Sequence, residues 1–132
     1  MSGNPNIFPA IRYRDAPAAI EWLTRAFGFE QHFVVPDDHD RITHAELQIG
    51  RGMVMLNSKG DPRATANPWD TVDHGIYVCI ADVNAHYARA KAAGAEIARE
   101  LQDTDYGSRE YSVRDLEGRL WSLGTYDPYA AS

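Results

Sequence analysis

The chain has 132 residues, of which 44% are hydrophobic, and its formal net charge at pH 7 is -6. This length and composition suit one globular domain with a buried core, and no apolar run approaches the roughly 20 residues that cross a bilayer. The arginines are scattered along an acidic chain, which argues against a nucleic-acid partner. A single cysteine, Cys79, excludes an internal disulfide and a thiolate metal cluster. These features predict a cytoplasmic protein with no membrane partner, whose acidic surface favours a cationic small molecule.

The first half of the chain reads as a strand, a helix and three further strands. An extended run at residues 7–14 precedes Asp15 and Pro17, which suit the cap and first turn of a helix that ends at Gly28. Apolar residues recur in this helix at helical spacing: Ile20, Leu23, Ala26 and Phe27. The three extended segments that follow are residues 29–36, 41–50 and 52–58.

The second half repeats this order. A strand-like run at residues 75–81 precedes Asp82, which is again the candidate cap of a helix that stops at Gly94. The inner stripe of this helix would consist of Val83, Tyr87 and Ala90. The three extended segments after it are residues 95–102, 109–115 and 119–126. The chain is therefore an internal repeat of two βαβββ modules.

The repeat predicts an α+β fold in a single domain that spans residues 1–132. Module one covers about residues 6–58, a turn-rich linker covers about 59–73, and module two covers about 74–127. Two such modules would pair into a curved eight-stranded mixed sheet, with the helices on its outer face. The concave inner face is where a ligand would bind.

Paired βαβββ modules of this length resemble the vicinal oxygen chelate superfamily, which includes glyoxalase I, extradiol dioxygenases and the bleomycin-resistance proteins. The most specific part is DYGSREYSVRDLEGRLWSLG at residues 105–124, which looks like the last hairpin of the bleomycin-resistance and related glyoxalase-like proteins. Residues 14–30 and 82–97 look like the two helices of the family with their flanks. The resemblance implies the glyoxalase/bleomycin resistance fold.

Metalloenzymes of this superfamily hold a divalent ion with His or Glu side chains from the first and last strands of both modules. Counting from the two helix caps and from the turn at Gly118, the matching positions are Phe8, Gly75, Ser122, and either Met55 or Leu56. None of these residues is a good ligand for a hard divalent ion. The comparison therefore predicts neither a metal nor another cofactor at this position.

An unconventional metal site is the alternative. His74 lies one residue before Gly75, so a one-residue slip of the strand register would bring it into the position of a family metal ligand. The same slip would turn the apolar residues of that strand away from the face that packs against the helix. His44 and Glu46 project to one face of their strand and could join it. A polar strand face beside a pocket explains these two residues equally well.

Strand parity indicates which residues face the concave side: Arg12 follows Phe8, and Tyr77 and Cys79 follow Gly75. Cys79 is either a small buried group or a thiol that lines the pocket. Trp69 and Tyr106 are either aromatic lids over a ligand or loop residues packed on the domain edge. In the hairpin, Arg109 and Glu110 are either ligand contacts or a solvated surface ion pair, and Tyr111 and Val113 compete with Ser112 for the inner face. The candidate ligand-binding residues are Phe8, Arg12, His44, Glu46, Trp69, Tyr77, Tyr106, Arg109, Tyr111 and Ser122.

Without a metal, the superfamily's proton-transfer and dioxygenase chemistry loses its Lewis acid or redox centre. The sequence thus favours a metal-independent small-molecule binding protein of the bleomycin-resistance type, which sequesters a drug or a cationic or planar metabolite. The resemblance implies a homodimer, because that type forms its ligand grooves in a dimer. A glyoxalase-like or dioxygenase-like metalloenzyme with a non-standard site, and a metal-free enzyme that uses Tyr, His or Arg for acid–base work, are the alternatives.

Overall fold

The computed structural model describes residues 4–61, 63 and 67–130. Its elements follow in the order β1 (Ile7–Tyr13), α1 (Ala16–Phe27), β2 (Glu30–Pro36), β3 (Ile42–Ile49), β4 (Gly52–Ser58), a short 3-10 helix η1 (Pro68–Thr71), β5 (His74–Cys79), α2 (Val83–Ala92), β6 (Glu96–Asp103), β7 (Arg109–Arg114) and β8 (Leu120–Gly124). The βαβββ order thus occurs twice, and η1 lies in the linker between the two copies.

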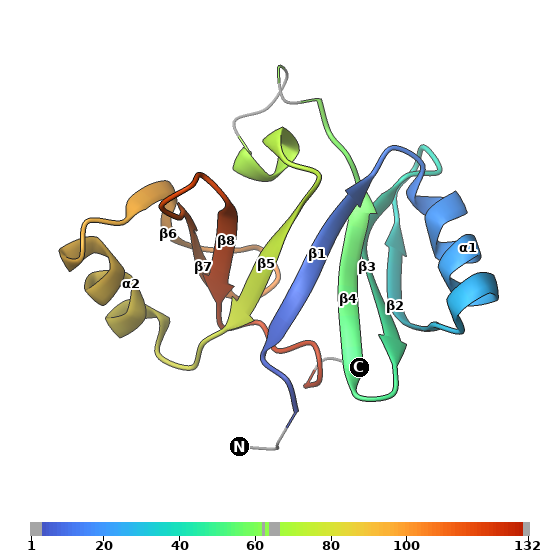
Figure 1. Ribbon diagram of the computed structural model, residues 1–132, viewed down its shortest axis with the longest axis horizontal. Coiled ribbons are helices and arrows are strands. Elements are labelled where there is room, and N and C mark those ends of the chain that lie inside the picture. Colours follow the sequence, from blue (N-terminus) through green and yellow to red (C-terminus); the bar gives the residue numbers. More distant parts are fainter. Residues whose placement is uncertain (1–3, 62, 64–66, 131–132) are drawn as a thin grey trace.

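All eight strands belong to one sheet, in the order β2-β3-β4-β1-β5-β8-β7-β6. Within each copy the first strand pairs in parallel with the last, and β1 and β5 join the two copies through antiparallel pairing. In Figure 1, β1 and β5 lie side by side in the middle, and α1 and α2 flank the two ends of the curved sheet. The predicted α+β fold with an eight-stranded mixed sheet is confirmed, and the sheet is not closed.

The predicted helix caps are present. The Asp15 carboxylate accepts a hydrogen bond from Ala18 N at 3.1 Å, and Asp82 accepts one from Ala85 N at the same distance. Each side chain satisfies one of the backbone N–H groups that have no partner within the first helical turn. Gly28 ends α1 in the left-handed conformation, with φ of 80°.

The buried stripe of α1 is shorter than predicted. Ile20 and Leu23 are buried, but Ala26 is exposed and Phe27 is 57% exposed. The Phe27 ring packs edge-on against that of Trp22, with 4.7 Å between centroids. Phe27 lies in the last turn of the helix, beyond the part that covers the sheet, so its spacing matches the stripe without placing it in the core.

Three apolar clusters hold the fold together. One lies between α1 and the first half of the sheet, and a second lies between α2 and the other half, where it includes the predicted stripe of α2 together with Trp121 and Leu123. The third lies on the concave face and consists of Phe8, Met53, Met55 and Tyr77, with Tyr126 and Tyr129 packed on it. The concave face is therefore partly filled by the protein's own side chains.

The segment after β8 supplies these two tyrosines. β8 ends at Gly124, whereas the sequence predicted a strand that continues to Tyr126. The chain instead crosses from the second module toward the first: the Tyr126 hydroxyl donates a hydrogen bond to Glu46 Oε2, and Tyr129 donates one to Arg51 O. In Figure 1 the coloured segment that follows β8 runs toward the lower end of β4. This crossing covers one end of the concave face and ties the two modules together.

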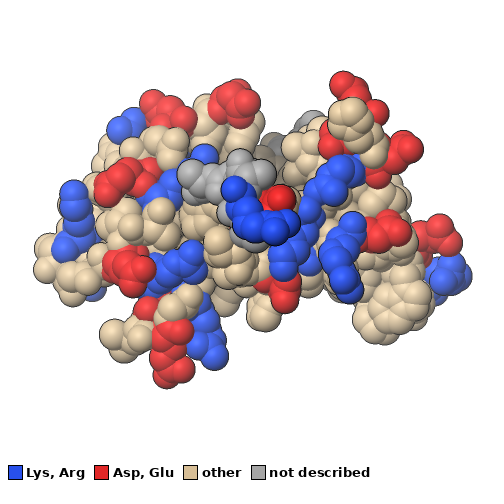
Figure 2. Space-filling view, turned by 90° about the horizontal axis from the view of Figure 1, so that it is seen from above, with Lys and Arg blue, Asp and Glu red and all other residues tan. Residues whose placement is uncertain are grey.

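Charged side chains of both signs share the surface. On the face in Figure 2, several Lys and Arg side chains gather near the middle, with carboxylates beside and around them. Among the described residues, no helix has both the length and the apolar character that crossing a membrane requires.

Candidate functional site

A cavity of about 720 Å³ opens on the concave face, between the two modules. Its walls come from strands of both modules, from η1 and from the turn between β6 and β7. The predicted residues that line it are Arg12, His44, Trp69, Tyr77, Tyr106, Tyr111 and Ser122. Its volume is in the range of small-molecule sites.

The indole of Trp69 forms one wall. Its Nε1 donates a hydrogen bond to Ser122 Oγ at 2.8 Å, and Ser122 Oγ lies 2.6 Å from Ser112 Oγ on the neighbouring strand. A Cβ atom at Gly75 would lie only 2.7 Å from the Trp69 ring. Position 75 therefore has to be glycine for the indole to lie against β5.

The positions at which the superfamily's enzymes hold a metal are occupied by packed, non-ligating groups. Phe8 is fully buried, with ring centroids of Tyr77 and Tyr129 at 6.2 and 5.8 Å. Met55 packs in the same cluster, and Gly75 lies against the indole. An aromatic ring, a thioether and a glycine do not make a donor set for a hard divalent ion, and a lone hydroxyl, that of Ser122, does not complete one.

The alternative metal site that would include His74 does not form among the described residues. Gly75 itself faces the concave side against Trp69, so the one-residue slip that would bring His74 into register does not occur, and His74 is exposed on β5. His44 and Glu46 do lie together, but the described residues contain no group of three or more His, Cys, Asp or Glu placed to hold an ion.

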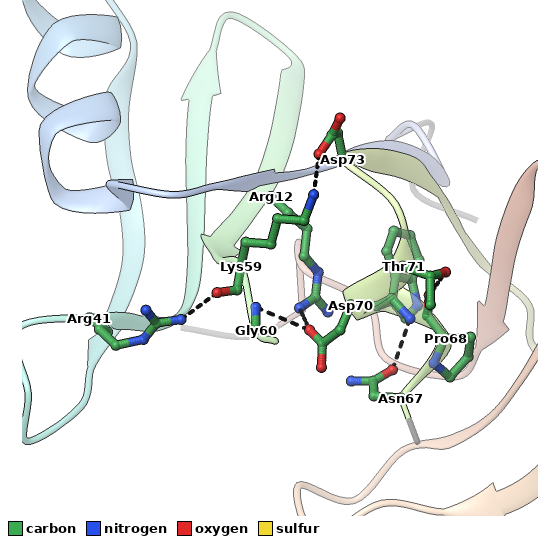
Figure 3. Close-up of polar contacts among 10 residues, drawn as sticks. Arg12, Arg41, Lys59, Gly60, Asn67, Pro68, Asp70, Thr71 and Asp73 are labelled. Atoms are coloured by element: carbon green, nitrogen blue, oxygen red, sulfur yellow. Dashed lines mark hydrogen bonds and ion pairs between the residues drawn. The ribbon is translucent and has the colours of Figure 1, made fainter. Parts of the chain in front are cut away.

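Trp69 is positioned by a buried ion pair between β1 and η1 (Figure 3). Arg12 Nη1 lies 2.7 Å from Asp70 Oδ1, and the two side chains are only 10% and 7% exposed. Burial lowers the pKa of Arg12, while the Asp70 carboxylate opposes that shift. The same carboxylate accepts a hydrogen bond from Gly60 N, and the guanidinium lies 5.7 Å from the centre of the Trp69 ring. Arg12 therefore supports the wall of the cavity, with its charge matched by Asp70.

Glu46 lies behind the opposite wall. It is fully buried, His44 Nε2 lies 2.7 Å from its Oε2, and the Tyr126 hydroxyl donates to the same oxygen. His32 Nε2 is 3.8 Å from Oε1, which has no hydrogen-bond partner among the described residues. His44 lines the cavity and Glu46 does not, so the histidine is the member of this pair that a ligand would touch.

Tyrosines and a second carboxylate complete the walls. Tyr106 donates a hydrogen bond to Glu110 at 2.8 Å, and its ring meets that of Tyr126 edge-on at 6.1 Å. Burial raises the pKa of Tyr77, Tyr106 and Tyr126 well above its ordinary value, and the nearby carboxylates Glu110 and Glu46 add to the shift. All three hydroxyls consequently remain protonated and act as donors at neutral pH.

Three predicted residues have side chains engaged in contacts outside the cavity. Arg109 is on the surface, where it forms an ion pair with Asp103 at 3.0 Å. Tyr111 borders the cavity, but its ring packs edge-on against Tyr87 beneath α2 and its hydroxyl lies 2.6 Å from His86 Nδ1. The inner face of β7 belongs to Ser112, so we do not retain Tyr111, Arg109 or the buried Phe8 as ligand contacts.

Sequence reasoning left Glu110 open and missed Tyr126. Glu110 and Ser112 are two positions apart on β7, so they project to the same face of the strand. Assigning the inner face to Ser112 would therefore also have placed Glu110 at the cavity. Tyr126 lies beyond the last strand, where no periodic pattern exists to orient a side chain.

Residues 8–123 match the family described as the Glyoxalase/Bleomycin resistance protein/Dioxygenase superfamily. The chain belongs to this superfamily. Uncharacterized proteins from Mycobacterium tuberculosis H37Rv (Rv0887c) and Mycobacterium bovis (Mb0911c) are both 32% identical to it over 125 residues, which is 91% of this chain and 74% and 82% of those proteins.

Solved structures of the superfamily share the fold. A glyoxalase/bleomycin resistance protein/dioxygenase superfamily member from Vibrio splendidus 12B01 aligns with a TM-score of 0.70 at 17% identity, over 89% of this chain and 96% of that one. A variant of Streptomyces coelicolor methylmalonyl-CoA epimerase in complex with 2-nitronate-propionyl-CoA aligns with a TM-score of 0.69 at 21% identity, over 92% and 93%. At these identities the likeness concerns the fold alone.

Proposed function

We propose that this member of the superfamily binds small molecules without a metal, and that its ligand is planar and cationic, such as a drug or metabolite that it sequesters in the cytoplasm. The observation that supports this most directly is the Trp69 indole, which lies on Gly75 and bonds Ser122 where the superfamily's enzymes place metal ligands. An aromatic surface thus replaces a Lewis acid beside the cavity.

The charge around the cavity favours a cation. Glu110 and Asp105 line it, and Glu46 lies directly behind His44. Two arginines line the cavity, and the charge of Arg12 is neutralised by its ion pair with Asp70. Only the positive charge of Arg99 then opposes the negative charges of these carboxylates. Opposite charge in a partly dry site attracts a cationic ligand.

The rings around the cavity favour a flat ligand. Tyr77, Tyr106, Tyr126 and Trp69 all line it, and aromatic faces attract both flat ring systems and cations, by about 0.5–2 kcal/mol per cation contact. Sequestration and a homodimer are both proposed by analogy with the bleomycin-resistance type. Light scattering on the purified protein would show whether it is a dimer.

Tryptophan fluorescence tests the location of binding. We expect 9-aminoacridine, a flat cation at neutral pH, to raise the melting temperature and to quench the protein's fluorescence. The chain has three tryptophans, of which Trp69 lines the cavity and Trp22 is exposed on α1. Trp69→Phe should therefore remove much of the quenching, whereas Trp22→Phe should leave it unchanged. No thermal shift with any of a panel of flat cations would count against the proposed function, and equal quenching in both variants would place the ligand elsewhere.

A further inference from the structure

Glu46 and His44 form a hydrogen-bonded pair in the cavity wall. Glu46 is fully buried on β3, and two groups converge on its Oε2: His44 Nε2 at 2.7 Å and the Tyr126 hydroxyl. Burying a carboxylate is costly unless it is hydrogen-bonded. Glu46 itself does not line the cavity, so it can affect a ligand only through the imidazole of His44.

The contacts of Oε2 determine the tautomer of His44. Burial raises the pKa of Tyr126, so its hydroxyl keeps its proton and donates to the carboxylate. The oxygen can accept from two donors and Tyr126 is one of them, so a hydrogen on His44 Nε2 accounts for the 2.7 Å contact. A neutral imidazole with hydrogen on Nε2 has a lone pair on Nδ1. In this tautomer the second ring nitrogen of His44 is a hydrogen-bond acceptor.

The ring of His44 is held in place. It packs edge-on against the rings of Phe33 and Tyr126, with centroid distances of 6.4 and 6.2 Å, while its side chain stays 32% exposed. His44 lines the cavity, and Nδ1 takes part in none of the hydrogen bonds found among the described residues. A fixed ring with an unused acceptor is what a selective hydrogen bond to a ligand requires.

We propose that His44 Nδ1 is an acceptor subsite that selects flat cations carrying an N–H group, such as protonated ring nitrogens and amidiniums, over fully alkylated cations of similar shape. This inference rests on the proposed function, since it names the ligand chemistry of the same cavity. Glu46 is the positioning residue, which fixes the tautomer without touching the ligand. A charged N–H donor matches both this acceptor and the carboxylates around it.

Two probes of similar shape separate this inference from the function on which it rests. At neutral pH 9-aminoacridine carries N–H donors, and 10-methylacridinium is a flat cation with none. Calorimetry on the wild-type protein should show at least about 10-fold tighter binding of 9-aminoacridine. If neither cation binds, the proposed function fails. If both bind with the same affinity, only the acceptor subsite is wrong.

The matched variant is His44→Phe, which keeps an aromatic ring between Phe33 and Tyr126 but removes both ring nitrogens. It should weaken 9-aminoacridine by about 10-fold and leave 10-methylacridinium unchanged. An equal loss for both probes would show that His44 acts only through packing. Glu46→Gln should reduce the preference in the same way, since an amide can donate to Nε2 and so reverse the tautomer.

Nitrogen NMR of the wild-type protein tests the tautomer in a chain that needs no substitution. The ¹⁵N shifts of His44 should show hydrogen on Nε2 and a bare Nδ1, and 9-aminoacridine should move the Nδ1 signal more than 10-methylacridinium does. Hydrogen on Nδ1 in the free protein at neutral pH would overturn the proposal.

Discussion

Replacing Asp70 with asparagine should lower the free energy of unfolding by about 3 kcal/mol, because it removes one partner of a buried ion pair. The substitution keeps the size of the side chain and an oxygen that can accept from Gly60 N and from Arg12. What it removes is the negative charge opposite the guanidinium, in the network of Figure 3.

The magnitude follows from the burial of both partners. The two side chains are 10% and 7% exposed, so little water is available to replace the lost carboxylate around Arg12. Two unit charges about 4 Å apart interact by about 4 kcal/mol at an effective dielectric constant of 20, and the retained amide oxygen recovers about 1 kcal/mol of that. Burial already lowers the pKa of Arg12, which shows that its charged form is disfavoured without a partner.

Urea unfolding followed by circular dichroism measures the effect. The matched control is Glu21→Gln, the same change from carboxylate to amide in an ion pair with Arg25 whose side chains are 75% and 67% exposed. That variant should lie within about 0.5 kcal/mol of the wild type. If Asp70→Asn is no more destabilising than Glu21→Gln, Arg12 is hydrated and the argument that it holds the wall of the cavity fails.

Three further predictions concern the cavity and its surroundings. Ser122→Ala should cost about 1–3 kcal/mol in urea unfolding, since it leaves the Trp69 N–H without its acceptor; a neutral result would mean that water takes the place of the hydroxyl. Burial raises the pKa of Tyr77 above the ordinary value of about 10, so its contribution to stability is complete below that pH and is lost as the pH rises from there through the folded-state pKa. Tyr77→Phe should flatten the fall in stability above about pH 10, and an unchanged slope would refute this. Burial also raises the pKa of Cys79, so at mildly alkaline pH a disulfide reagent should react more slowly with the native chain than with the urea-unfolded chain, and equal rates would contradict the shift.

Much of the fold follows from local signals that the sequence carries twice. Asp15 and Asp82 were predicted as helix caps, and both accept the expected hydrogen bonds. Strand alternation placed Arg12, Tyr77 and Ser122 on the concave face, and all three line the cavity. These features depend on neighbours a few residues apart, which a single sequence displays directly.

The parts that sequence reasoning left open or missed depend on contacts between distant segments. Trp69 was either a lid or an edge residue, and a bond to Ser122, 53 positions away, settles its direction. Tyr126 was assigned to a strand, but the chain leaves the sheet at Gly124 and packs the tyrosine on Glu46, 80 positions away. No periodic pattern exists in a linker or a tail, so their side chains cannot be oriented before the sheet is assembled.

The dependence of 9-aminoacridine binding on metal ions tests the central claim most directly. The dissociation constant should be measured by calorimetry on protein dialysed against EDTA, and again with saturating Zn²⁺, Mn²⁺ or Ni²⁺. Because Phe8, Gly75 and Ser122 offer no donor set for an ion, we predict tight binding in EDTA and the same constant with each metal. Binding that appears only when a metal is added would contradict the account.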